Sequence, residues 1–167
     1  MTHQNSLWAL GSVAAAAMMA ACPALADAGA ADRPNTVAVE LGGRTGELGV
    51  QYERALGDLI SAGGGVGLFS ISCTECRQAS SFGTASAYMT LNERVGGVHS
   101  FFVSGGATLV MGGGVWAVPG VGVGYRLQSP GGFVMRVSVT LVGLPGDRGL
   151  ANALWVPWPG LQLGYAF

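Results

Sequence analysis

Apolar residues alternate with small or polar residues along most of the chain after residue 35. The last seven residues, LQLGYAF, are the clearest example, because leucine, tyrosine and phenylalanine occupy every other position. Between Phe133 and Leu141 the odd positions are all apolar, while the even positions include arginine, serine and threonine. A period of two predicts β-strands that present one apolar face and one small or polar face.

The same pattern predicts eight strands. Their expected ranges are 36–43, 47–56, 59–71, 81–91, 100–111, 116–127, 132–142 and 154–167. The connections at 57–58, 92–97 and 128–131 would lie at one end, and those at 44–46, 72–80, 112–115 and 143–153 at the other. An all-β, antiparallel up-and-down meander with a short-turn end and a longer-loop end is the simplest topology.

The first 26 residues follow a different pattern. An apolar run from Leu7 to Ala21 is followed by Ala24-Leu25-Ala26, a small-x-small sequence that signal peptidases accept. We therefore expect a helical signal peptide at 1–26, a short flexible lead-in at 27–34 and one barrel domain at 35–167. The alternatives are a lipoprotein signal with Cys22 lipidated and an uncleaved anchor, for which the run is short.

Composition narrows the surroundings in which such strands can fold. Charged residues make up 10% of the chain, half of the residues are apolar, and 29 are glycine. Soluble domains usually draw about a quarter of their residues from the charged types, and so apolar a chain is not disordered. The net charge of −1 offers no basic patch for nucleic acid.

The distribution of polar residues favours a barrel in a membrane. A soluble barrel would turn its apolar face inward and expose a charged face, but the non-apolar face here is mostly glycine, serine and threonine. The reverse assignment fits better, with the apolar face toward lipid and the small polar face lining the lumen. The sheet must then close, because an open edge would leave unsatisfied backbone groups in hydrocarbon.

Outward-facing aromatic residues gather toward the short-turn end under this topology. Amphipathic rings prefer the headgroup level of a bilayer, so a group at one height indicates an interfacial girdle. The residues of this predicted girdle are Tyr52, Phe101, Tyr125, Phe133, Tyr165 and Phe167.

Together these features resemble the small eight-stranded outer-membrane β-barrels of Gram-negative bacteria, the OmpA/OmpX-type family. The resemblance covers residues 36–167. It implies an outer-membrane location, a lipid-embedded monomer, both termini in the periplasm, and recognition of the terminal Phe167 by the outer-membrane insertion machinery. Eight strands of about 10 residues use roughly 80 residues, and twice that number would leave nothing for loops, which excludes a general porin.

Four charged residues are predicted to lie within the lumen: Glu40, Glu53, Arg126 and Arg136. Buried charges are normally paired, and by their height we expect Glu40 to pair with Arg136 and Glu53 with Arg126. Such pairs would form either a structural salt-bridge network that fills the lumen or a gate in a small pore.

Many glycines also fall on the lumen face. In a barrel of eight strands the interior is just wide enough for side chains to fill, so these glycines would compensate for large inward residues such as Phe69, Tyr88, Phe102 and Arg136. A small hydrated cavity is the alternative. The predicted inward glycines are Gly42, Gly49, Gly63, Gly65, Gly67, Gly106, Gly122, Gly124, Gly160 and Gly164.

The predicted loops carry few chemically distinctive residues. Cys73 and Cys76 are expected to form a local disulfide in an oxidising compartment. Arg44, Arg77 and Arg148 fall on or beside the longer loops, where they would be solvated or would contact lipopolysaccharide phosphates.

No catalytic site is predicted. After signal removal the chain has one histidine, His99, and its neighbour Ser100 would point to the opposite face of the strand. We expect no cofactor and no metal. The sequence therefore predicts an outer-membrane barrel with a structural or surface-exposed accessory role, with a narrow channel and a secreted soluble barrel for a small apolar ligand as alternatives.

Overall fold

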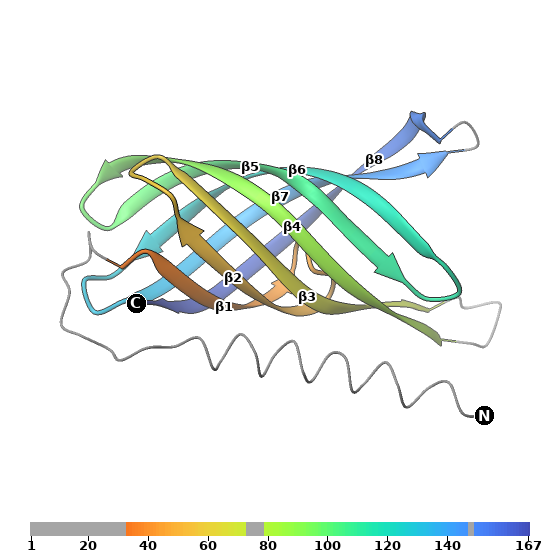
Figure 1. Ribbon diagram of the computed structural model, residues 1–167, viewed down its shortest axis with the longest axis horizontal. Coiled ribbons are helices and arrows are strands. Elements are labelled where there is room, and N and C mark those ends of the chain that lie inside the picture. The colour runs from red at the N-terminus through yellow and green to blue at the C-terminus, as the bar shows by residue number, and fades with distance from the viewer. Residues whose placement is uncertain (1–32, 73–78, 147–148) are drawn as a thin grey trace.

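The computed structural model describes residues 33–72, 79–146 and 149–167, and the predicted signal peptide lies outside these residues. Eight antiparallel strands form an elongated barrel (Figure 1). They are β1 (Asn35–Gly42), β2 (Leu48–Ala55), β3 (Ile60–Ser72), β4 (Ala79–Gly96), β5 (His99–Met111), β6 (Val115–Gln128), β7 (Phe133–Gly146) and β8 (Gly149–Ala166). None of the described residues belongs to a helix that is long and apolar enough to span a membrane.

Each strand pairs with the next in sequence, and β1 also pairs with β8, so the sheet closes on itself. Thr36 lies opposite Ala166, and Gly42 lies opposite Gly160. Closure satisfies the backbone hydrogen bonds that a sheet edge would expose. The predicted fold class, an eight-stranded antiparallel up-and-down barrel, is confirmed.

The connections at the two ends of the barrel differ less in length than the sequence predicted. At the turn end, residues 56–59, 97–98 and 129–132 join the strands, and the C-terminus lies at the same end (Figure 1). At the opposite end, which we call the hairpin end, the expected loop at 143–153 is mostly strand. Its glycines and proline indicated a loop. Cross-strand pairing nevertheless continues from Leu144 opposite Leu154 to Gly146 opposite Gly149, across an irregularity.

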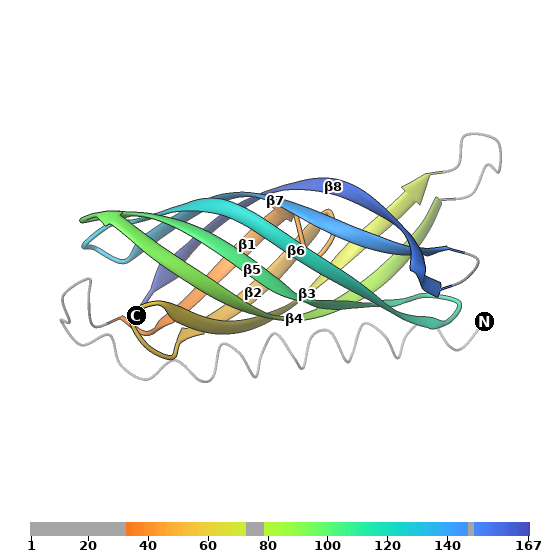
Figure 2. The same cartoon turned by 90° about the horizontal axis from the view of Figure 1, so that it is seen from above.

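In Figure 2, strands β3 to β8 reach farther toward the hairpin end than β1 and β2 do. The pairing of β3 with β4 continues to Ser72–Ala79, and that of β7 with β8 to Gly146–Gly149. Long paired strands therefore replace part of the predicted loops, which moves the expected strand boundaries outward.

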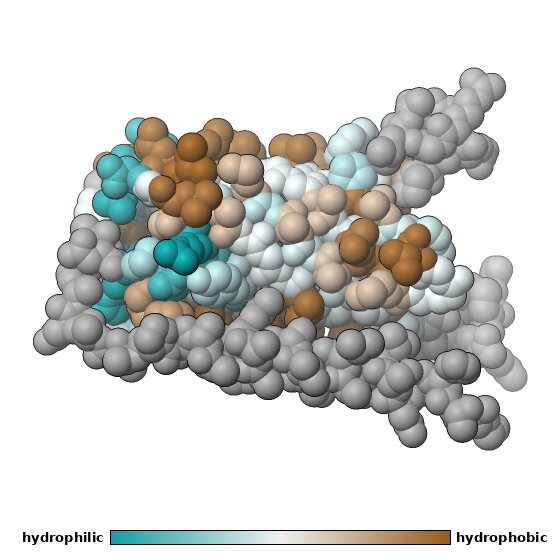
Figure 3. All heavy atoms as spheres, viewed as in Figure 1, coloured by the Kyte–Doolittle hydropathy of each residue, from teal (hydrophilic) through white to brown (hydrophobic). Residues whose placement is uncertain are grey.

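Side chains alternate between the two faces of the barrel wall as predicted. Apolar residues cover much of the outside, while strongly hydrophilic residues gather toward the turn end (Figure 3). Met89, Val103 and Val123 are each at least half exposed on the outer face. Inward positions are instead buried and mostly polar or small, as at Thr90, whose exposed fraction is 1%. The buried interior of this fold is therefore its lumen, and that interior is mostly polar.

Candidate functional site in the lumen

An acidic residue of β2 lies at the centre of an ion-pair cluster across the lumen. Glu53 accepts hydrogen bonds from both terminal nitrogens of Arg136 on β7, one of them at 2.6 Å, and from Nη1 of Arg126 on β6 at 3.3 Å. Ser61 donates a further hydrogen bond at 2.9 Å. We call these four residues the Glu53 cluster. Because its members come from β2, β3, β6 and β7, it links opposite walls of the barrel.

Glu40 does not pair with Arg136, so that predicted pair is wrong. Its carboxylate accepts hydrogen bonds from the side-chain amides of Gln51 at 2.6 Å and Gln162 at 2.8 Å, and from Thr45. Gln162 lies opposite Glu40 on one side and opposite Arg136 on the other, so it separates them. The heights predicted for Glu40 and Arg136 were wrong because they were counted from the strand ends, whereas barrel strands tilt by about 35–45°.

The connection between β1 and β2 folds into the barrel. Arg44 and Thr45 have exposed fractions of 8% and 0%, so the expectation of a solvated Arg44 on an outer loop is wrong. Gly43 and Gly46 have φ angles of 81° and 109°, in the left-handed region that glycine adopts without a Cβ clash. These conformations turn the chain inward, and we call residues 43–46 the inner loop.

Hydrogen bonds hold the inner loop against both sides of the lumen. The amide of Thr45 donates to Glu40 Oε2 at 2.8 Å, and the guanidinium of Arg44 donates to Ser104 Oγ at 2.8 Å. Thr108 donates to the carbonyl of Arg44 at 3.2 Å, and Thr84 donates to the carbonyl of Thr45. The inner loop therefore bridges β1 to β4 and β5.

Glycines on β2 and β3 make room for the inner loop. A Cβ at Gly65 would lie 2.8 Å from Thr45 Cγ2, and one at Gly67 would lie 3.0 Å from Thr45 Cβ. A Cβ at Gly49 would also collide with the Thr45 side chain. The predicted compensation by inward glycines is therefore present, but here the large neighbour is a loop rather than a strand residue.

Two aromatic side chains occupy the space left by other glycines. The ring of Tyr88 would lie 2.7 Å from a Cβ at Gly63, and the ring of Phe102 would lie 2.6 Å from a Cβ at Gly124. The guanidinium of Arg44 lies over Tyr88, 4.6 Å from the ring centroid. Tyr88 also donates a hydrogen bond to Gln51 at 2.7 Å, which connects the ring to the Glu40 carboxylate.

Between the inner loop and the hairpin end, the lining of the lumen becomes apolar. A pocket of about 220 Å³ lies there, which we call the hairpin-end pocket, and its exposed lining is almost entirely apolar. Val118, Val142 and Leu144 line it, and Phe69 packs edge-on against Trp158 with ring centroids 5.3 Å apart. This apolar region of the lumen was not predicted from the sequence. Consecutive inward valines and leucines near the strand ends were the available signal.

The residues of the predicted aromatic girdle lie near the turn end, on the outer face. Phe101, Phe133 and Tyr165 are more than two-fifths exposed, and the rings of Phe101 and Tyr125 pack edge-on, 5.6 Å apart. Tyr52 donates to the side-chain carbonyl of Asn35 at 2.7 Å. The backbone of Phe167 pairs with Asn35 at the end of β1. Contact of these rings with lipid headgroups stays a prediction.

Several expected features fall on residues that the structure does not describe. Cys73, Cys76 and Arg77 belong to the segment 73–78, and Arg148 to the segment 147–148. The predicted disulfide and the predicted lipopolysaccharide contacts of the two arginines therefore remain predictions. His99 and Ser100 do point to opposite faces: Ser100 is buried, whereas His99 is exposed and contacts the Tyr125 hydroxyl.

A closed eight-stranded barrel with an apolar outside and a charged, hydrogen-bonded lumen is the architecture of a small outer-membrane barrel. The N-terminal β-barrel domain of OprF from Pseudomonas aeruginosa is similar, with a TM-score of 0.58 and 14% identity over 80% of this chain and 96% of that one. The outer membrane protein Ail of Yersinia pestis has a TM-score of 0.53 and 14% identity over 80% and 98%.

No protein-family model and no curated protein sequence matches the chain. At 14% identity the two solved structures show a shared fold alone. The fold implied by the resemblance to small outer-membrane barrels is thereby confirmed.

Proposed function

We propose that the chain is a monomeric integral outer-membrane barrel with a structural or surface-exposed accessory role, whose lumen is closed by side chains and internal ion pairs. The observation that carries this proposal is the Glu53 cluster, in which Arg126 and Arg136 reach Glu53 from the opposite wall. We infer that this cluster and the inner loop, whose Arg44 and Thr45 are buried, together block the cross-section that an open pore would need.

The exterior supports a membrane location. Leu41, Leu91 and Val139 are among the large apolar side chains that are more than two-fifths exposed, and they lie on different strands. An apolar surface that encircles the barrel is stable in hydrocarbon but costly in water. This distribution disfavours the soluble alternative. The likeness to Ail, an outer membrane protein of a Gram-negative bacterium, supports the outer membrane in particular.

A structural role, rather than an enzymatic one, is supported by how the polar lumen residues are used. The carboxylates of Glu40 and Glu53 each accept hydrogen bonds from three neighbouring side chains. We propose Phe167 as the contact for the insertion machinery, since its backbone pairs with Asn35 where β8 closes the barrel against β1.

Single-channel recording in planar bilayers tests the proposal. We expect a flat current at all voltages for the wild-type barrel, and conductance steps for the double variant Arg126→Ala/Arg136→Ala, which removes both cations of the Glu53 cluster. The matched control is Arg54→Ala, an exposed arginine on the outer face, which should stay closed. Stepwise conductance of the wild-type barrel would overturn the proposal in favour of a narrow channel.

A further inference from the structure

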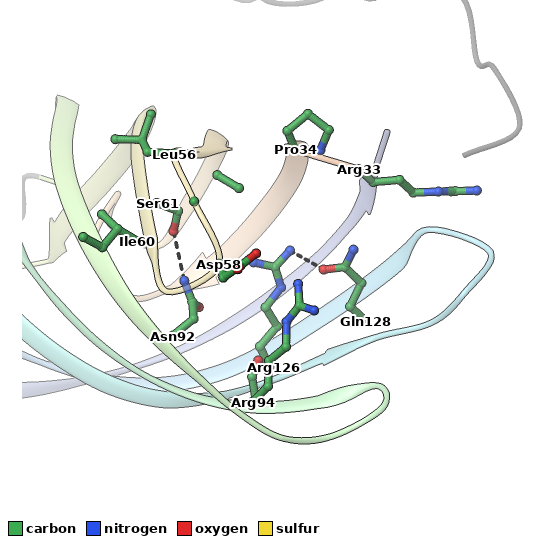
Figure 4. Close-up of a pocket in the computed structure, with 13 residues that line it drawn as sticks. Arg33, Pro34, Leu56, Asp58, Ile60, Ser61, Asn92, Arg94, Arg126 and Gln128 are labelled. Carbon is green, nitrogen blue, oxygen red and sulfur yellow. Dashed lines mark hydrogen bonds between the residues drawn. The ribbon is translucent and has the colours of Figure 1, made fainter. Parts of the chain in front are cut away.

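The turn end of the lumen opens into a second pocket, of about 430 Å³, that lies beside the Glu53 cluster (Figure 4). We call it the turn-end pocket. Unlike the hairpin-end pocket, it is lined by charged and hydrogen-bonding groups, among them Arg94, Arg126, Asn92, Ser100 and Asp58. Figure 4 shows the side chains of Arg94 and Arg126 extending into this pocket side by side.

The strand register explains why these groups converge. Arg94 on β4 lies opposite Ser100 on β5, and Ser100 lies opposite Arg126 on β6. Neighbouring strands are about 4.8 Å apart, so the two arginine backbones are separated by about 10 Å with a serine between them. Two guanidinium groups and a hydroxyl therefore point into one space from three adjacent strands.

Among the described residues around the turn-end pocket, the positive charges of arginine exceed the negative charges of carboxylates. Arg126 shares the carboxylate of Glu53 with Arg136, and Arg94 forms no ion pair with any of the described residues. Asp58 is the acidic residue among those that line the pocket. Arg33 also lines it, but its side chain extends away in Figure 4 and donates to the carbonyl of Ala166.

Some hydrogen-bond donors of Arg126 and Ser100 also remain without an acceptor in the described part of the chain. Three acceptors contact the terminal nitrogens of Arg126, namely Glu53 at 3.3 Å, Thr36 at 3.2 Å and Gln128 at 2.5 Å, whereas a guanidinium carries five N–H donors. The Ser100 hydroxyl has no hydrogen-bond partner among the described residues. Guanidinium forks match the geometry of phosphate oxygens, and charge-assisted hydrogen bonds of this kind are the stronger ones.

We propose that the turn-end pocket binds a small oxyanion, a phosphate or phosphate ester, between the guanidinium groups of Arg94 and Arg126, with the hydroxyl of Ser100 as a further donor. The anion neutralises the unpaired charge of Arg94 and the shared charge of Arg126. Its source is either a soluble phosphate or a phospholipid headgroup at this end of the barrel.

Titration of the folded barrel with inorganic phosphate, followed by the NMR signals of the Ser100 amide and the Asn92 side chain, tests this proposal. The barrel is held in dodecyl maltoside micelles, which contain no phosphate, at constant ionic strength. We expect a saturable shift that Arg94→Gln weakens by about fivefold or more, because it removes one charge-assisted contact. Asp58→Asn should strengthen binding, because it removes the opposing carboxylate.

Arg54→Gln is the matched control, since Arg54 is an exposed arginine on the outer face toward the same end of the barrel. It should leave the affinity within about twofold if binding depends on the pocket rather than on general charge. No saturable shift in the wild type, or equal weakening by Arg54→Gln and Arg94→Gln, would overturn the proposal.

A second titration assigns the source of the anion. In phosphatidylglycerol nanodiscs, weaker apparent phosphate binding than in micelles means that a lipid headgroup occupies the pocket, and equal binding means that the ligand is soluble. Both outcomes support an oxyanion site.

Discussion

The two halves of the lumen are filled in different ways, and the inner loop lies between them. Toward the turn end, Glu40 and Glu53 are surrounded by arginine, glutamine, serine and threonine donors. Toward the hairpin end, Val118, Val142 and Leu144 surround an apolar pocket of about 220 Å³. One half is therefore held by specific polar contacts and opens into a polar pocket, and the other surrounds an apolar pocket.

This contrast indicates which half of the lumen constrains the fold more tightly. A buried polar network is costly when any member loses its partner, so each residue in it is tightly constrained. Apolar side chains beside a void can change shape with little loss. We therefore expect substitutions in the turn-side half to destabilise the barrel more than equivalent substitutions in the hairpin-side half.

The largest effect is expected from removing the central carboxylate. Glu53→Ala leaves Arg136, which is 3% exposed, buried without its anionic partner. Breaking a buried pair in this way typically costs about 3–5 kcal/mol. Urea unfolding of the refolded barrel in lipid vesicles measures the loss. Glu93→Ala, at an exposed carboxylate near the turn end, is the control and should change the unfolding free energy by less than about 0.5 kcal/mol.

A smaller loss is expected at the boundary between the halves. Gly65→Ala places a methyl group 2.7 Å from the carbonyl of Val50 and 2.8 Å from both Thr45 and Gln51, so the inner loop and β2 must both shift. Overpacking of this kind costs about 1–3 kcal/mol. The control is Gly105→Ala on β5, where an added Cβ meets nothing within 4 Å. Equal unfolding free energies for the two variants would show that the inner loop is not packed against β3.

The smallest effect is expected from Val142→Leu, which is compared with a substitution in the other half of β7. Val142→Leu extends into the hairpin-end pocket and should cost less than about 1.5 kcal/mol. Val134→Leu enlarges a residue that is 1% exposed near the turn end, and it should cost about 1–3 kcal/mol. If Val142→Leu proves the more destabilising of the two, the contrast in packing between the halves is wrong.

Most of the fold could be predicted from the sequence, because side-chain alternation reports directly which face of a strand is buried. All eight strands were expected, and the inward parity of residues such as Glu53, Thr90 and Arg136 agrees with their burial. The strand ends were less predictable. In the β7–β8 hairpin, glycine and proline indicated a loop, whereas cross-strand pairing continues past them.

The site was predictable in its residues but not in its contacts. Parity placed Glu40 and Arg136 in the lumen, but their height depends on strand tilt and register, which the pattern does not contain. Arg44 was missed because a loop residue has no parity, and its burial follows from the backbone of Gly43 and Gly46. The space left by Gly49, Gly65 and Gly67 on neighbouring strands was the indirect signal.

Glu53 and Arg136 are expected to stabilise the barrel across the lumen. A double-mutant cycle tests this most directly. The unfolding free energies of Glu53→Ala, Arg136→Ala and the double variant are compared with that of the wild type. We predict a coupling energy above about 1 kcal/mol, so that the double variant loses less than the sum of the single losses. Additive losses would contradict the claim.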